Sequence, residues 1–208
     1  MARPRAADHE DKRQLILDQA ARLFAAHGYD RTSTAMIAEA CGVSKALLYH
    51  YHADKQELLF DVLAQHLQHL LVVVRGAADE RFTPRERLEN VAVALLEAYR
   101  DADAVHQVQI GCLGLLPPER QENLRTLERA IVGEVAVVIE DLSPEVRRDR
   151  RLLKPATMSV FAMLNWHYFW HREDGPVSRA GYARMAAALV AEGLPGAAAA
   201  LREDAAAG

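Results

Sequence analysis

The sequence has few cysteines and no uninterrupted apolar run long enough to cross a membrane. Its two cysteines, Cys41 and Cys112, lie in segments that we assign to different domains, so a reducing compartment without a structural disulfide is the simplest account. No signal-peptide pattern precedes the first expected helix. These absences predict a cytoplasmic protein that makes no contact with a membrane.

The chain also lacks an excess of positive charge. It carries 25 Lys and Arg against 29 Asp and Glu, a formal net charge of -4. Residues 1–60 contain eight side chains of each sign, so this segment is neutral. Bulk attraction to nucleic acid is therefore absent, and any binding to DNA must depend on where individual basic side chains are placed.

Motifs of catalysis are missing as well. There is no Gly-rich phosphate loop, no nucleophile elbow and no zinc-hydrolase spacing, so we expect neither an enzyme nor a bound cofactor. His167 and His171 stand four residues apart, as do metal ligands on one helix face, and His66 and His69 form a second pair. No Glu follows His167 in the H-E-x-x-H manner and the cysteines are not paired, so we predict no metal site.

Helical periodicity dominates the chain, and no segment shows the alternation of a β-strand. With 208 residues, half of them hydrophobic, the chain can form two cores. We predict an all-α protein with an N-terminal three-helix helix-turn-helix domain over residues 11–71 and a larger C-terminal helical domain over residues 72–208. The expected helices cover 8–26, 54–81, 83–100, 118–142, 152–171 and 178–192, and the alanine-rich tail after Pro195 is expected to be short or frayed.

The most informative stretch runs from Thr32 to Leu59. A short helix is expected up to Gly42, after which Ser44 opens a second helix whose inner side carries Leu47 and Leu48. A turn of about three residues between two short helices is the spacing of a DNA-binding helix-turn-helix.

A third helix follows directly. Asp54 and Glu57 have the D-x-x-E spacing of a capping box, which would direct the first backbone N–H groups and Lys55 toward a nearby phosphate. The segment therefore predicts a helix that reads a DNA groove together with a phosphate contact.

At these residues the chain resembles the TetR family of bacterial regulators. The resemblance covers about Lys12 to Leu71 and is carried by Ile16-Leu17, Ala20-Ala21, LFAAHGYDRTST, Ile37-Ala38, CGVSK at residues 41–45, Leu48-Tyr49-His50-Tyr51 and Lys55. Two residues depart from the family pattern, Cys41 in place of Ala and His52 in place of Phe. The second departure predicts a looser seam between the recognition helix and the helix after it.

This resemblance implies roles for nine residues. Base edges would be contacted by Ser44, Lys45, Ala46 and Tyr49, and phosphates by Ser33, Thr34, His50, Tyr51 and Lys55. For Tyr49 and Tyr51, packing between the helices is an equally good explanation.

The last expected helix indicates a homodimer. Tyr182, Met185, Ala186, Leu189 and Val190 share one face, and neighbouring alanines permit close helix approach. In the TetR family the last two long helices form a four-helix bundle with those of a second subunit. Two recognition helices related by a two-fold axis would read a palindromic operator in double-stranded DNA.

Aromatic and polar residues of the second domain are candidates for the lining of an effector cavity, although a plain core explains most of them equally well. The candidates are Tyr99, His106, Gln109, Ile110, Leu113, Phe161, Asn165, Trp166 and Phe169.

The segments LPPERQENLRTLERAIV and LLKPATMSVFAMLNWHYFWHREDGPVS are similar to the ligand domain of TetR-type catabolic repressors that respond to acyl-CoA thioesters. This similarity implies an acyl-CoA or aryl-CoA effector whose phosphates would meet Arg120, Arg125 and Arg129. Solvated surface charge is the plainer explanation for each arginine. The alternatives left open are a regulator of efflux or stress genes that senses a hydrophobic molecule, a metal sensor, and a purely architectural DNA-binding dimer.

Overall fold

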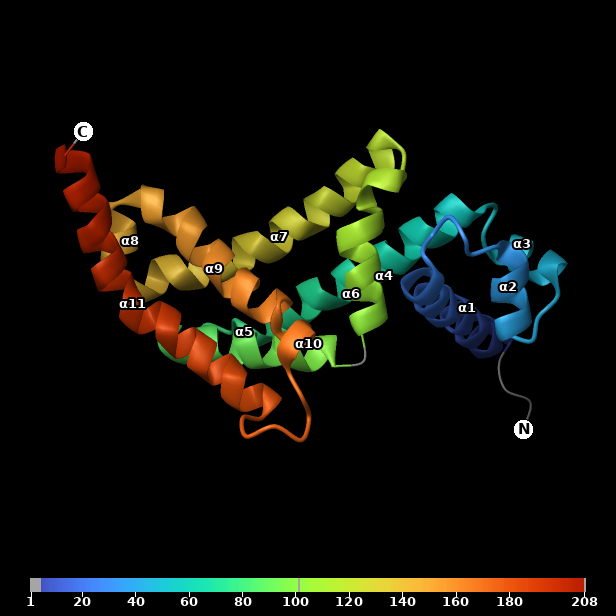
Figure 1. The fold of residues 1–208 in the computed structure, drawn as a ribbon, viewed down its shortest axis with the longest axis horizontal. Coiled ribbons are helices and arrows are strands. Elements are labelled where there is room, and N and C mark those ends of the chain that lie inside the picture. Colours follow the sequence, from blue (N-terminus) through green and yellow to red (C-terminus); the bar gives the residue numbers. More distant parts are fainter. Residues whose placement is uncertain (1–4, 101, 208) are drawn as a thin grey trace. The chain divides into compact units, whose positions relative to one another are not determined.

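The computed structural model describes residues 5–100 and 102–207, which form helices and contain no strand (Figure 1). The expectation of an all-α fold is confirmed. The elements are α1 (Arg5–His27), α2 (Thr34–Ala40), α3 (Lys45–Tyr51), α4 (Lys55–Ala77), α5 (Pro84–Tyr99), α6 (Asp103–Cys112), η1 (Leu113–Leu115), α7 (Pro118–Leu142), α8 (Pro144–Arg148), η2 (Arg150–Leu152), α9 (Leu153–Asn165), α10 (His167–Trp170) and α11 (Arg179–Ala207).

The chain divides into two compact units. An N-terminal unit comprises residues 1–68 and 101–127, and a C-terminal unit comprises residues 69–100 and 128–208. The helices α4 and α7 each contribute to both units, because the divisions fall within their bounds. The two predicted domains, 11–71 and 72–208, are each one continuous segment, whereas each compact unit combines two segments. These domain limits remain a prediction.

In the N-terminal unit α1 packs against α2 and α6. Its inner side is formed by Ile16, Ala20 and Phe24, all at most 2% exposed. Gly28 ends the helix with a φ of 82°, a left-handed conformation that glycine adopts without a steric penalty.

In the C-terminal unit α11 packs against α5 and α9. Leu88, Leu95 and Leu96 of α5 are buried in this core. Arg87 is also buried; it donates to the carbonyl of Ala78 at 3.0 Å and to Asp141 at 2.8 Å. The first contact joins α5 to the residue that follows α4, which ends at Ala77 and not at Arg81 as expected.

The expected helix over 152–171 is interrupted. The helix α9 ends at Asn165, Trp166 forms its C-cap, and the short α10 follows. The opposite difference occurs in α11, which continues through Pro195 to Ala207. Leu194 and Ala198 on either side of this proline are buried, so packing against the unit maintains the helix where local preference predicts its end.

By length and composition alone, α4 is the one helix in residues 5–100 and 102–207 that could cross a membrane. Half of its most apolar window is buried inside the fold. The buried core helix of a soluble protein meets the same criterion, so α4 is weak evidence for a membrane span.

Candidate nucleic-acid interface

The two short helices of the helix-turn-helix begin at capping serines, of which Ser44 was expected to open the second helix. The Ser33 hydroxyl accepts from the N–H of Met36 at 3.2 Å, and the Ser44 hydroxyl accepts from the N–H of Leu47 at 3.1 Å. Between them Gly42 adopts a φ of 63°, which reverses the chain in the left-handed region. The turn therefore has a glycine at the one residue of the segment that requires it.

The helix α3 buries one side and exposes the other. Leu48 is 1% exposed, whereas Lys45, Ala46, Tyr49 and His50 are exposed. The residues expected to meet DNA thus share the solvent-facing side of a capped helix. Leu47, expected in the core, is only half-buried.

Tyr49 connects the two helices of the motif. Its hydroxyl lies 3.0 Å from the Thr34 hydroxyl on α2, while half of the side chain remains exposed. Both of the roles considered for Tyr49 are therefore compatible with its placement. Tyr51 is half-buried, and its ring lies 4.5 Å from that of His9.

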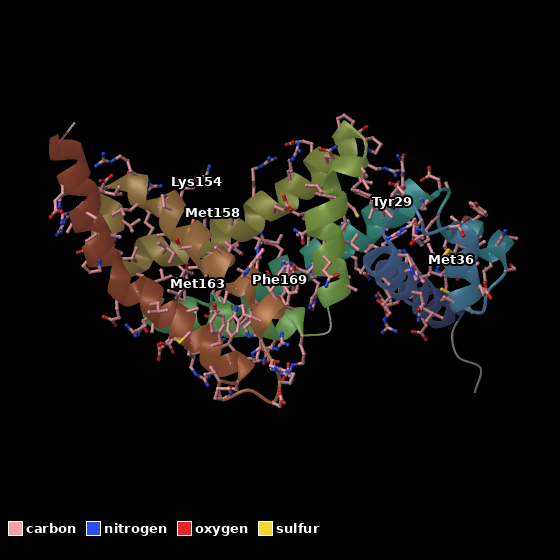
Figure 2. All side chains as sticks on the ribbon, viewed as in Figure 1. Tyr29, Met36, Lys154, Met158, Met163 and Phe169 are labelled. Atoms are coloured by element: carbon pink, nitrogen blue, oxygen red, sulfur yellow. The ribbon has the colours of Figure 1, made fainter. Side chains whose placement is uncertain are left out.

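Lys55 has a structural role that the sequence did not predict. Its ammonium donates to the carbonyls of Tyr29 at 2.9 Å and Thr32 at 3.0 Å, and it lies 4.2 Å from the centre of the Tyr29 ring. Figure 2 marks Tyr29 in the segment between α1 and α2. Lys55 therefore fixes this segment, and one of its three donors is left for another acceptor.

The capping box ahead of α4 is close to the expected one. The Asp54 carboxylate accepts from the N–H of Glu57 at 2.6 Å, and the Glu57 carboxylate accepts from the N–H of Ala53. Directly before it, His52 is 1% exposed, and its Nδ1 lies 3.1 Å from Asp61 Oδ2. From the sequence we expected His52 to loosen the contact between the recognition helix and the next helix. That expectation did not take the carboxylate of Asp61 into account.

The candidate effector residues fall in both units. In the C-terminal unit the Tyr99 hydroxyl donates to Asn165 Oδ1 at 3.0 Å, and burial raises the pKa of Tyr99. Phe161 is buried nearby on α9. Trp166 and Phe169 instead stack on each other at 4.4 Å and are 59% and 62% exposed, so they form surface and not an enclosed wall in the single chain. Both residues follow the break after Asn165.

In the N-terminal unit His106 is buried, and Gln109 and Leu113 are half-buried. The guanidinium of Arg120 lies 5.7 Å from the centre of the Phe60 ring, and Arg125 donates to Gln121. Arg129 belongs to the other unit and is exposed. The side chain of Ile110 lies outside the described residues.

The C-terminal unit has an open apolar groove of about 300 Å³ between α9 and α11. Met163, Leu189 and Val190 are among its lining residues, and none of the candidate effector residues whose side chains are described lines it. Figure 2 shows Met158 and Met163 on α9, and Met158 is 46% exposed. This groove was not predicted as a site.

The histidines considered as metal ligands pack with aromatic rings. His167 and His171 stack at 4.1 Å, and the Tyr182 ring lies 5.0 Å from His167. Burial lowers the pKa of His167 to about 4, with further contributions from His171 and Arg179. Among the described side chains no group of three or more His, Cys, Asp or Glu is placed to hold a metal ion.

Comparison with known proteins identifies both parts of the chain. The model of bacterial regulatory proteins of the tetR family matches residues 16–62, and the model of the tetracyclin repressor-like C-terminal domain matches residues 81–194. A TetR-family transcriptional regulator from Bordetella parapertussis is 34% identical with a TM-score of 0.79, over 86% of this chain and 93% of that one.

Two further relatives are informative. The transcriptional repressor KstR2 of Mycobacterium tuberculosis is 33% identical over 87 residues, 42% of this chain and 44% of KstR2. The structure of AibR in complex with isovaleryl coenzyme A and operator DNA has a TM-score of 0.72 at 22% identity, over 86% of this chain and 97% of that one. The second match shows the fold alone. The chain belongs to the TetR family, whose members are DNA-binding transcriptional regulators and not enzymes.

Proposed function

We propose that the protein is a ligand-responsive repressor that binds a palindromic operator as a homodimer in the cytoplasm and leaves it when a small molecule binds. The observation that carries this proposal is the capped helix α3 with a solvent-facing row of Lys45, Ala46, Tyr49 and His50. A helix presented in this way fits the major groove.

The proposed contacts divide into two kinds. Ser44, Lys45, Ala46 and Tyr49 read base edges, with Lys45 donating to guanine and Ala46 touching a thymine methyl group. Ser33, Thr34, His50, Tyr51 and the remaining donor of Lys55 contact phosphates, which position the protein without reading sequence.

Dimerisation is proposed through α9 and α11. Of the five residues expected on one face of the last helix, Tyr182, Ala186 and Val190 are buried within the chain. Met185 and Leu189 are 46% and 58% exposed and lie one turn apart, and Met158 of α9 is also exposed. Apolar side chains of this size on adjoining helices favour burial against a second copy.

An acyl-CoA or aryl-CoA thioester is the effector class that we propose. Support comes from the sequence similarity of the ligand domain to acyl-CoA-responsive repressors and from the fold shared with AibR, which was solved with isovaleryl coenzyme A. Binding would have to differ in affinity between the DNA-bound and released conformations, with α4 as the element that moves.

Thermal stability tests the effector. Short and long acyl-CoA and aryl-CoA thioesters should raise the melting temperature and release operator DNA, whereas free CoA and the free acids should have little effect. Equal effects of the free acids would favour a sensor of hydrophobic molecules. No shift with any thioester would contradict the proposed class.

A further inference from the structure

The residue at the end of the recognition helix joins three helices of the N-terminal unit. His52 is the C-cap of α3, and its backbone N–H donates to the carbonyl of Leu48 at 3.0 Å. Its buried ring places Nδ1 3.1 Å from Oδ2 of Asp61 in α4. Nη2 of Arg13 in α1 lies 3.4 Å from the same oxygen. We name His52, Asp61 and Arg13 the seam cluster.

Arg13 and Asp61 of the seam cluster carry opposite charges, although less than a third of either side chain is exposed. Burial alone would raise the pKa of Asp61, but the contacts with His52 and then Arg13 outweigh burial, so its pKa lies below the ordinary value. Asp61 is therefore an ionised carboxylate that accepts from Arg13 and lies 3.1 Å from Nδ1 of His52. Such a pair contributes little net stability compared with apolar packing.

We propose that His52 is a positioning residue for DNA binding, which holds the recognition helix in register on α4 through Asp61. An apolar ring in place of His52 would fill the same space, but apolar surfaces of α3 and α4 could then slide past each other. A contact between the ring and one carboxylate oxygen of Asp61 sets the distance between the two helices. Because α4 begins at Lys55, a shift of this helix would displace α3 through the same contact. This inference rests on the proposed function and names a step in its regulation.

The test compares folding with operator affinity in four variants of the full chain. His52→Phe should melt at or above the temperature of the wild type, since an apolar ring replaces a buried polar one. It should nevertheless bind a selected operator about tenfold more weakly, and so should Asp61→Asn. His52→Asn keeps a donor near the place of Nδ1 and should recover affinity to within about threefold of the wild type.

The double variant His52→Phe/Asp61→Asn should bind no more weakly than Asp61→Asn alone, because Asp61→Asn already removes the carboxylate that His52 contacts. Unchanged affinity in His52→Phe, losses that multiply in the double variant, or no recovery with His52→Asn would overturn the inference. If His52→Phe fails to fold, the other two single variants test the inference. Asp61→Asn should still bind about tenfold more weakly than the wild type, and His52→Asn should bind within about threefold of it. A wild-type protein that selects no operator would instead contradict the proposed function.

Discussion

Lys45 and Lys55 are both basic residues of the DNA-binding unit, but their surroundings differ. Lys45 is exposed at the start of α3, whereas the ammonium of Lys55 donates to two carbonyls of the segment before α2. Their replacement should therefore have different consequences for folding and for recognition.

Lys45→Ala should leave the melting temperature unchanged and cost about 1–3 kcal/mol of binding to the selected operator. Because the lysine is proposed to read a base, preference at one operator position should relax. Fluorescence anisotropy on operator and scrambled duplexes measures both effects. Equal losses on the two duplexes would contradict a reading role.

Lys55→Ala should destabilise the fold by about 2 kcal/mol, since two charge-assisted hydrogen bonds to the Tyr29 and Thr32 carbonyls are lost. Binding to operator and scrambled duplexes should weaken alike. Urea unfolding gives the stability, and Lys154→Ala, which replaces an exposed lysine of α9, offers a matched lysine variant. If Lys55→Ala has the same free energy of unfolding as the wild type, the contacts of Lys55 with the Tyr29 and Thr32 carbonyls contribute nothing to stability.

His167 makes stability dependent on pH. Its pKa, lowered to about 4 by burial, lies below the ordinary value of 6.5, so the unfolded chain binds a proton that the folded chain does not. Stability should therefore be complete above pH 6.5 and fall as the pH is lowered toward 4. Between pH 7 and 4.5 the wild type should lose on the order of 2 kcal/mol more than His167→Phe.

Urea unfolding at a series of pH values measures this difference. His69→Ala, which removes an exposed histidine, provides the control variant. Parallel curves for the wild type and His167→Phe would exclude His167 as the source.

At the scale of elements, much of the fold can be predicted from local sequence because caps are local interactions. Ser33, Ser44 and the capping box of Thr83 and Glu86 begin α2, α3 and α5 through hydrogen bonds between residues three apart. Contacts across the fold are different. Lys55 meets Tyr29 and His52 meets Asp61 only after packing, and no spacing in the sequence indicates these pairs.

Pro195 is the clearest case of packing that overrides local preference. Pro195→Ala should stabilise the protein by about 1–3 kcal/mol, because it restores a helical N–H and removes the clash of the proline ring within α11. Pro84, in the first turn of α5, is the matched control, since Pro84→Ala should bring no gain. Urea unfolding compares the two, and an unchanged Pro195→Ala protein would contradict a continuous helix there.

The effector residues were the least predictable part of the candidate site. Aromatic content indicated a cavity, but Trp166 and Phe169 lie on the surface, just beyond the end of α9 at Asn165. Periodicity locates apolar faces and does not tell which of them stay exposed in one chain.

At the scale of the whole molecule, the exposed residues of α9 and α11 predict a dimer. Leu189→Arg should convert the protein to a monomer, because it places a charge in the proposed apolar interface. Val137→Arg replaces an equally apolar, 51% exposed residue on α7 and should leave the dimer intact. Light scattering after size-exclusion chromatography distinguishes the two. A dimeric Leu189→Arg protein would place the interface elsewhere.

The central claim is tested most directly by selecting bound sequences from a random pool of DNA duplexes, with and without a mixture of acyl-CoA thioesters. We expect a palindrome with half-sites about one helical turn apart, which is enriched by the protein alone and lost when the mixture is present. If the palindrome is still enriched in the presence of the thioester mixture, the proposed effector class is contradicted but the assignment of DNA binding stands. A pool without any enriched palindrome would contradict the account of a dimeric, operator-specific repressor.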